Sequence, residues 1–519
     1  MKKLLCTLLA LALAASLAPM ALASGEPVTL QVSVFERGNT TNTYGSATDN
    51  YWTRWLQQGF GDPNNIKLEY VPIPRAEESA KLNTLMASGA APDIIFSYDT
   101  RMIMNYGRDG GLTALTDLLP EYGQNLLANI APALEYGVLN GEQYAIPAQR
   151  AKTGRYANFI RKDYLDAQGI ELAVNEDGFY HMSIEDFEAI LYNAKGVGES
   201  GLETYPLGMA GAYNATQAKP IIFAFVDGAQ LTGEIAASTP QPLWPGYRDG
   251  VKFLNKLYND GIMDPDFMID TDTALPSFNT QVSTGRAIAF GQDDFYETGI
   301  VALYESDPNA EFVAFQLDNP YGTQVIPTYA PIGMYVAVPA TSQHPEAAVS
   351  YLNYLADYDV CRVLAYGIEG VHYEMVDGSP ANIEYTEEEK AVIEGYERIT
   401  VGDLNLVYNG QPFGYATSLR GLTDAKARHT RLNDVASQLS RVGGVADYYW
   451  QGIVTEAEEM YDGFLANLNN GDGLPLLIAC PAAEFDALWE STMNDYLSQG
   501  GQEVIDSKIE LYRQLEGIN

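Results

Sequence analysis

Strand-like and helix-like segments alternate after residue 24, and this alternation constrains the fold more than any other feature. Short apolar runs predict strands, and longer segments closed by stop signals, such as SGAAP at 88–92, predict helices. Strands that alternate with helices form a mostly parallel sheet with helices on both faces. We therefore predict an α/β protein, with strands at 30–35, 66–73 and 93–96 and helices at 51–59 and 77–87.

The first 23 residues have the pattern of a secretory signal peptide. Lys2 and Lys3 precede an apolar run over 4–17 that is too short to span a bilayer. Ala21-Leu22-Ala23 then supplies the small residues that signal peptidase requires. We expect cleavage after Ala23 and an exported protein, located outside the cell or in the cell envelope (periplasmic).

The cysteines bear on anchoring and on the redox state. Cys6 lies too early in the leader for a lipoprotein, whose acylated cysteine stands at the cleavage point, and no small residue precedes it. This favours a free exported protein over a lipid-anchored one, although membrane association stays open. Cys361 and Cys480 could form one disulfide, but two buried thiols are the favoured interpretation.

The composition of the chain limits the classes of molecule that it is expected to bind. The formal net charge of −38 disfavours nucleic acid and anionic lipid, because a polyanionic surface repels both. Hydrophobic residues make up 46% of the chain and charged residues 19%, which is typical of a folded protein. The 35 tyrosines suit ligands such as sugars and peptides, since each ring pairs an apolar face with a polar tip.

An ordered series of motifs resembles one protein family over about residues 28–515. The chain is similar to the family 1 extracellular solute-binding proteins of ABC importers, and within it to the large branch labelled LipO or aldouronate-type. The motifs are SGAAPDII at 88–95, NGEQYAIP at 140–147, IRKDYL at 160–165, FLNKLYNDGIMDP at 253–265, HPEAA at 344–348 and GIEGVHY at 367–373. The long loop at 36–50 and the missing lipobox depart from the family pattern, so ligand identity and anchoring cannot be carried over.

The resemblance implies a two-lobed periplasmic-binding-protein-like fold (type II) with a hinge. Lobe one is expected to take residues 24–150 and 330–380, and lobe two residues 151–329 and 381–519. Each lobe is expected to have a mostly parallel sheet flanked by helices. The ligand, a carbohydrate, would be captured between the lobes and delivered to the permease of an ABC importer. We expect a monomer and no cofactor, and the sequence leaves calcium binding open.

Enzymatic alternatives find little support in the sequence. None of the four histidines stands in an H-E-x-x-H motif, and G-x-S-x-G is absent. The adjacent carboxylates Asp293 and Asp294 point to opposite faces if they lie on a strand, so they are poor partners for one glycosidic bond. We expect a binding protein rather than an enzyme. A secreted glycoside hydrolase with another carboxylate pair and a peptide-binding protein are the alternatives.

Candidate ligand-binding residues follow from the rule that ligands lie at the carboxyl ends of parallel strands. Sugars are held by aromatic faces and by charged groups that bond to hydroxyls. Arg37, Asp99 and Arg150 are expected to bind a polar ligand without contributing to the stability of the unliganded protein. The full set is Phe35, Glu36, Arg37, Tyr98, Asp99, Arg150, Tyr213, Asp293, Phe295 and Glu369, with Trp244 and Trp450 as platforms.

Overall fold

The computed structural model describes residues 27–41, 43–196, 203–211, 216–270, 275–293, 296–399, 401–410, 413–415, 417–450, 453–461 and 473–518. The expected signal peptide at 1–23 lies outside these residues. Among the described helices, none combines the length and the apolar character that a membrane crossing needs.

The chain divides into two compact units. The first contains the described residues of 1–152, 331–420 and 451–453, and the second those of 153–330, 421–450 and 454–519. The first two changes of unit fall within two residues of the boundaries expected at 150 and 330. The expected assignment of residues 381–420 to the second lobe is corrected, because they belong to the first unit. Leu404, Leu406 and Val407 are buried there, and the short strand that follows pairs with the first unit's sheet.

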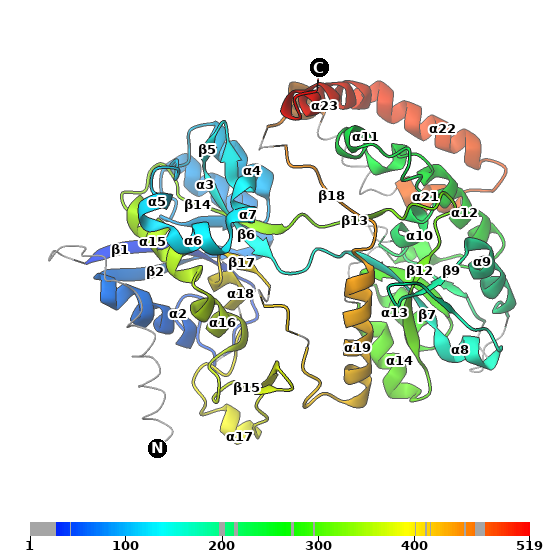
Figure 1. Cartoon of the computed structure of the whole chain (residues 1–519), viewed down its shortest axis with the longest axis horizontal. Coiled ribbons are helices and arrows are strands. Elements are labelled where there is room, and N and C mark those ends of the chain that lie inside the picture. Colours follow the sequence, from blue (N-terminus) through cyan, green and yellow to red (C-terminus); the bar gives the residue numbers. More distant parts are fainter. Residues whose placement is uncertain are drawn as a thin grey trace. The chain divides into compact units, whose positions relative to one another are not determined.

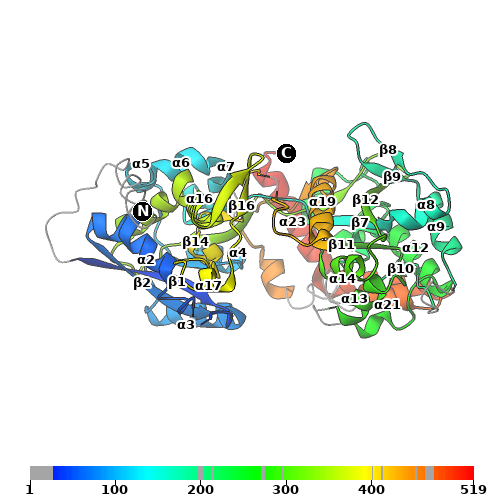
Figure 2. The same cartoon turned by 90° about the horizontal axis from the view of Figure 1, so that it is seen from below.

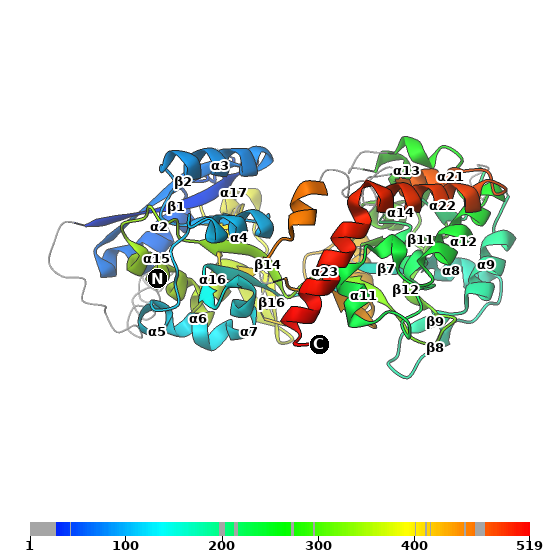
Figure 3. The same cartoon turned by 90° about the horizontal axis from the view of Figure 1, so that it is seen from above.

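The sheet of the first unit has one reversed strand. Strand β1 (Val28–Glu36) pairs in parallel with β2 (Ile66–Pro74), and its Val32 forms a parallel bridge to Ile94, next to β3 (Ile95–Ser97). Strand β14 (Ile332–Ala337) then lies antiparallel between β3 and β6 (Ala145–Arg150), and β17 (Tyr408–Asn409) is parallel to β6. Only β14 therefore runs against the other strands of this sheet. Figure 3 shows β1 and β2 with helix α3 (Glu78–Ser88) beside them.

The sheet of the second unit follows the same plan with two reversed strands (Figure 2). Its order is β10 (Leu207–Gly208), β11 (Ala289–Asp293), β7 (Tyr156–Arg161), β12 (Phe312–Leu317), β9 (Tyr180–Met182) and β8 (Ala173–Val174). The register makes β7 and β8 antiparallel to their neighbours, and the other pairs parallel. Most strands of each sheet run in one direction, but three of the five strand pairs in the second unit's sheet are antiparallel, so the prediction of a mostly parallel sheet is corrected there to a mixed sheet.

Both faces of strand β7 are covered, as expected for a central strand. Tyr156 and Ile160 pack into one hydrophobic cluster, and Ala157 and Phe159 pack into another on the opposite face. The alternation follows from the two-residue period of a strand. Helix α19 (Asp424–Leu439) contributes Leu432, Ala436 and Leu439 to the second cluster, and Figure 1 shows it beside α14 (Thr298–Ser306).

Helices cover the sheets in both units. In the first unit the remaining elements are α2 (Tyr51–Leu56), α4 (Thr100–Arg108), α5 (Leu119–Tyr122), α6 (Gln124–Asn129), α7 (Ala131–Leu134), β4 (Val138–Leu139), β5 (Glu142–Gln143), α15 (Pro345–Leu355), α16 (Tyr358–Tyr366), β15 (Tyr373–Val376), β16 (Ser379–Asn382), α17 (Glu387–Lys390) and α18 (Val401–Leu404). In the second unit they are α8 (Lys162–Ala167), α9 (Ile184–Asn193), α10 (Lys219–Phe223), α11 (Gly233–Ser238), α12 (Tyr247–Asn259), α13 (Pro276–Ser283), β13 (Ile326–Thr328), β18 (Gly444–Ala446), α21 (Gly473–Ala479), α22 (Phe485–Tyr496) and α23 (Gln502–Leu515).

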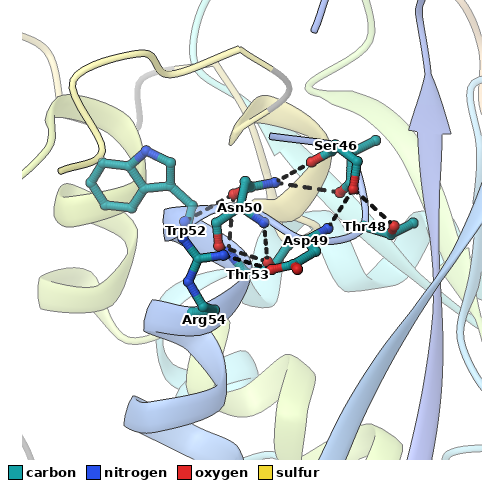
Figure 4. Close-up of polar contacts among 8 residues, drawn as sticks. Ser46, Thr48, Asp49, Asn50, Trp52, Thr53 and Arg54 are labelled. Atoms are coloured by element: carbon teal, nitrogen blue, oxygen red, sulfur yellow. Dashed lines mark hydrogen bonds and ion pairs between the residues drawn. The ribbon is translucent and has the colours of Figure 1, made fainter. Parts of the chain in front are cut away.

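Side-chain caps fix where several helices begin. The Asn50 side chain accepts hydrogen bonds from the backbone N–H groups of Trp52 and Thr53, at 2.9 and 3.2 Å, and the Thr53 hydroxyl accepts from the Asn50 N–H (Figure 4). These bonds satisfy N–H groups that a helix start leaves unpaired. The Asn50 amide also donates to the Ser46 carbonyl, so the end of the long loop at 36–50 is tied to helix α2.

Candidate ligand-binding site

The carboxyl edge of the first unit's sheet gathers several of the predicted residues. Strands β1, β3 and β6 end at Glu36, Ser97 and Arg150, and the antiparallel β14 begins at Ile332 beside β6. Parallel strands end at one edge of a sheet, and an antiparallel strand begins there. Glu36, Arg37, Tyr98, Asp99 and Arg150 therefore all belong to this edge.

Arg37 is held by a buried carboxylate. Its Nε and Nη2 atoms donate to Asp403 Oδ2 and Oδ1, both at 2.8 Å. The Asp403 side chain is 4% exposed and that of Arg37 is 34% exposed. The hydrogen bonds that Arg37 donates to Asp403 raise the pKa of Arg37 against the opposing effect of burial. This two-pronged pair uses much of the guanidinium's bonding capacity and fixes α18 to the end of β1.

Tyr98 and Phe35 form an aromatic pair under Arg75. Their ring centroids lie 6.1 Å apart in a stacked arrangement, and the Arg75 guanidinium carbon lies 5.0 Å from each centroid. Burial raises the pKa of Tyr98, as does the charge of Asp403. Phe35 is 0% exposed, so its predicted role as a ligand contact is wrong: its ring belongs to the core.

Arg75 is in turn paired with Glu78, which is 5% exposed. Glu78 also accepts from the Ser97 hydroxyl and from the backbone N–H of Tyr98. The two cations that follow strands β1 and β2, Arg37 and Arg75, therefore both have a buried carboxylate as partner. Neither Arg75 nor Asp403 was identified from the sequence, although Arg75 follows a predicted strand directly and the strand-end rule could have found it.

Asp99 caps helix α4. One oxygen of its carboxylate accepts from the backbone N–H of Met102 at 2.9 Å, and its own N–H donates to the Ser97 hydroxyl at 2.9 Å. An N-cap contributes to folding. The cap therefore predicts a contribution of Asp99 to the stability of the unliganded protein, contrary to the expectation from the sequence. Its side chain remains exposed, as do those of Glu36 and Glu369.

Arg150 ends strand β6 in the interior of the sheet. Its Nε donates to the carbonyl of Ile332 at 3.2 Å, and its backbone N–H donates to the carbonyl of Pro331 at 2.8 Å. The residue is half-buried. Arg150 lies two residues before Lys152, the residue after which the chain passes into the second unit.

The carboxyl edge of the second unit's sheet has a different set of groups. Strand β11 ends at Asp293, which lies opposite Tyr156 at the start of β7. The Arg155 guanidinium carbon lies 4.9 Å from the ring centroids of both Tyr156 and Tyr329. Burial raises the pKa of Tyr156. The sequence did not single out Arg155, Tyr156 or Tyr329.

Lys219 lies near this edge, at the start of α10. It is 5% exposed, and its pKa is lowered to about 8, mainly by burial and in the same direction by the charge of Arg155. Asp293 and Asp447 act in the opposite direction. Nothing in the local sequence distinguishes Lys219 from a surface lysine, because its burial depends on strands far away in the chain.

The two tryptophans have different surroundings. Trp244 is 6% exposed and its indole N–H donates to the Thr239 carbonyl at 2.9 Å, so the predicted platform role of Trp244 is wrong. Trp450 is half-buried and lies against Tyr448, with ring centroids 4.8 Å apart and the Lys508 ammonium 5.0 Å from its ring. Tyr213 and Phe295 lie outside the described residues, as does Asp294.

Cysteine and metal chemistry do not define this site. Cys361 and Cys480 are both free and buried, so the favoured interpretation of two buried thiols is confirmed. In the part of the chain that the structure describes, no group of three or more His, Cys, Asp or Glu side chains is placed to hold a metal ion.

The family follows from a match over more than half of the chain. The model of the bacterial extracellular solute-binding protein family matches residues 43–360. The chain belongs to this family. This match confirms the family that the motif series predicted.

Two curated relatives come from Bacillus subtilis. Lipoprotein LipO is 24% identical over 321 residues, which cover 60% of this chain and 62% of the relative. The polygalacturonan/rhamnogalacturonan-binding protein YtcQ is 23% identical over 320 residues, covering 60% of this chain and 61% of the relative. The matches thus span about three fifths of the length of these solute-binding relatives.

Solved structures share the fold over nearly the whole chain. The alginate-binding protein AlgQ2, solved without calcium ion, superimposes with a TM-score of 0.61 at 14% identity and covers 95% of this chain and 100% of its own. A solute-binding protein of Bifidobacterium longum infantis gives 0.63 at 15% identity, covering 94% and 99%. The predicted two-lobed, type II solute-binding fold is thereby confirmed.

Proposed function

We propose that the protein captures a carbohydrate, as an oligosaccharide, and delivers it to the permease of an ABC importer. The main supporting observation is that a guanidinium group lies against tyrosine rings at the carboxyl edge of each sheet. Arg75 contacts Tyr98 in the first unit, and Arg155 contacts Tyr156 and Tyr329 in the second. Aromatic faces suit the C–H surface of a sugar, and charged groups suit its hydroxyls. Family membership and the similarity to YtcQ, a polygalacturonan/rhamnogalacturonan-binding protein, support this assignment.

The residues proposed to bind the sugar are five predicted residues at the sheet edges, together with the exposed Glu369 and the half-buried Trp450. They are Glu36, Tyr98, Asp99, Arg150, Asp293, Glu369 and Trp450. Arg37 has a different proposed role, because its pair with Asp403 makes it a positioning residue for the end of β1. Isothermal titration calorimetry of alanine variants tests each assignment, and a change of less than twofold removes a residue from the set.

The ligand-binding test is a panel of oligosaccharides and short peptides in a thermal-shift assay. A ligand that binds only the folded state raises the melting temperature, because the free energy of unfolding grows with the logarithm of the ligand concentration over Kd. Concentration-dependent stabilisation by a saccharide, with the sugar recovered intact by chromatography, supports a binding protein. Cleavage of the sugar would instead support the glycoside hydrolase alternative, and stabilisation by peptides alone would support the peptide alternative.

We further propose that ligand drives closure of the two lobes, as the solute-binding resemblance implies, and that the closed form is the one the permease recognises. A smaller radius of gyration in solution scattering at saturating ligand is the expected result. An unchanged scattering profile contradicts closure. Size-exclusion chromatography with light scattering tests the expected monomer in the same samples.

Export and cleavage after Ala23 remain proposals, supported by membership of an extracellular family. N-terminal sequencing of the secreted protein is expected to read Ser-Gly-Glu-Pro. A lipid-modified cysteine at the mature N-terminus would contradict the free form.

A further inference from the structure

A cavity of about 490 Å³ lies within the first unit, between the long loop at 36–50 and helix α17. One wall of this α17 cavity is formed by the loop and the start of α2, and the other by α17 and the turn at 391–397. Figure 2 shows α2 and α17 next to each other. The Thr41 hydroxyl donates to the Glu397 carboxylate and joins the two walls. The volume lies in the range of ligand pockets, about 300–1,000 Å³.

The turn at 391–397 is held in place from below. The ring of Tyr51 packs directly on the backbone of Gly395, where a Cβ would lie 2.3 Å from the Tyr51 Cδ1 atom and where φ is +74°. Only glycine allows this contact without strain. The carbonyl of Glu394 accepts from His372 Nε2 at 3.0 Å. The wall is therefore shaped before a ligand arrives, which lowers the entropy cost of binding.

Three tyrosine rings line the α17 cavity. Tyr44 and Tyr51 come from the loop and α2, and Tyr396 comes from the opposite wall. Tyr396 is half-buried and meets the ring of Tyr385 edge-on, with the centroids 6.1 Å apart. Tyrosine combines an apolar ring face with a polar hydroxyl, so these rings suit a ligand that presents both C–H surface and hydroxyl groups.

The charged groups around the α17 cavity are already balanced by one another. Arg54 Nη1 donates to Asp49 Oδ1 at 2.6 Å (Figure 4), and Lys390 Nζ donates to Glu387 Oε1 at 2.7 Å. Glu394 adds a further carboxylate to the lining. A charged ligand would meet a group of its own sign here, whereas a hydroxyl group can accept from a cation and donate to a carboxylate. This arrangement favours a neutral ligand with many hydroxyl groups.

We propose that the α17 cavity is a second saccharide site, which binds a neutral oligosaccharide separately from the sheet edges; this inference rests on the proposed sugar-binding function. The tyrosine rings take the C–H faces of the sugar, and the paired charges take its hydroxyl groups. All residues of the cavity belong to the first unit, so binding there requires no closure of the two lobes.

Hydrogen–deuterium exchange locates the bound sugar. The probes are cellotriose, xylotriose and galactotriose, with triglycine as the zwitterionic comparison. We expect at least one of these trisaccharides to slow the exchange of backbone amides at 43–54 and 387–397, and triglycine to leave both segments unchanged. Asp99→Asn, which alters the sheet edge, is expected to retain this slowing. Calorimetry with the same trisaccharide is expected to show two sites in the parent protein.

Filling the α17 cavity with an indole ring tests the assignment directly. Ala391 and Thr43 are exposed residues on opposite walls, so Ala391→Trp and Thr43→Trp are each expected to occupy the space without disturbing the core. Each variant should lose the slowed exchange at 387–397 and retain one calorimetric site, with the affinity of that site changed by less than threefold. Ala128→Trp, at an exposed position of α6 in the same unit, is the matched control and should keep both sites. All three variants should melt with the parent protein, because surface substitutions change stability little.

The possible results separate the inference from the proposed function. One bound trisaccharide per protein, with unchanged exchange at 387–397, overturns the second site and leaves the proposed function standing. Slowed exchange that both filling variants retain also overturns it, since the sugar then lies elsewhere. Slowing by triglycine and by none of the trisaccharides overturns the choice of ligand. Failure of every saccharide to bind overturns the proposed function together with the inference.

Discussion

The two sheet edges differ in how their cations are balanced. In the first unit, Arg37 and Arg75 each have a buried carboxylate at hydrogen-bond distance, Asp403 and Glu78. In the second unit, Arg155 is held by aromatic rings and Lys219 is buried without a bonded partner among the described residues. The paired charges of the first unit hold its edge together, whereas the described residues of the second unit leave the Lys219 ammonium without a bonded carboxylate. The following predictions test that distinction.

The largest effect is expected from Arg37→Ala. Removing the guanidinium leaves Asp403, with a side chain that is 4% exposed, as a buried carboxylate without its partner. Breaking a fully buried pair costs about 3–5 kcal/mol of unfolding free energy, and the partial exposure of Arg37 places the expected loss at the lower end of that range. Urea denaturation of the unliganded protein measures the loss, and Arg37→Lys, which keeps the charge but not the two-pronged geometry, should lose less. A stable Arg37→Ala variant with weakened sugar binding would assign Arg37 to the ligand instead.

Lys219→Met is expected to act in the opposite direction. The pKa of Lys219 is about 8 when folded, below its value near 10.4 in the unfolded chain. Folding therefore disfavours the bound proton, and this penalty, up to about 3 kcal/mol at neutral pH, disappears as pH rises from 8 to above 10. The parent protein should gain stability relative to Lys219→Met over that interval. Parallel stability curves for the two proteins in urea titrations would contradict an uncompensated charge.

His372 in the first unit is a buried titratable group that stays neutral in the folded protein. Its Nδ1 accepts from the Ile368 N–H at 2.9 Å, and its Nε2 donates to the Glu394 carbonyl at 3.0 Å, which requires the neutral ring. Burial lowers its pKa to about 4, so the stability it provides is present above pH 6.5 and lost as pH falls towards 4. By pH 5 the loss should reach about 2 kcal/mol.

The His372 effect is measured by chemical denaturation at pH 7.5 and pH 5. The loss of unfolding free energy between the two pH values is compared between variants and the parent protein, because many carboxylates also titrate in acid. His372→Gln should show a smaller loss between the two pH values than the parent protein. His344→Gln is the matched control and should lose as much as the parent. If the His372→Gln variant keeps the full acid sensitivity, the neutral ring is not its source.

Asp99→Ala gives the smallest expected change. Losing the cap of helix α4 should cost about 1 kcal/mol. Asp99→Asn keeps an acceptor for the Met102 N–H and should restore most of that stability, while it removes the charge proposed to meet the sugar. Calorimetry of the two variants separates the roles: affinity lost in both indicates ligand binding, and affinity retained in Asp99→Asn indicates a purely structural cap.

Sequence reasoning predicted the fold and the first unit's edge better than the individual contacts. Strand ends are local signals, so Arg37, Tyr98 and Asp99 were placed at the correct edge. Burial is not local: residues 32 to 35 of β1 are all buried, and no alternation distinguishes Phe35 from a ligand contact. Lys219 was missed for the same reason, since its environment is made by Arg155, Asp293 and Asp447, which are distant in the sequence.

The reversed strand β14 has a consequence for the order of synthesis. It lies between β3 and β6 in the first unit, yet it emerges from the ribosome only after all of residues 153–330. A nascent chain that ends near residue 150 therefore has two sheet fragments with unpaired inner edges and cannot complete its core. Long-range pairing of this kind slows folding. For the export proposed above, the consequence is that the precursor keeps its first unit incomplete, and therefore unfolded, until late in translation.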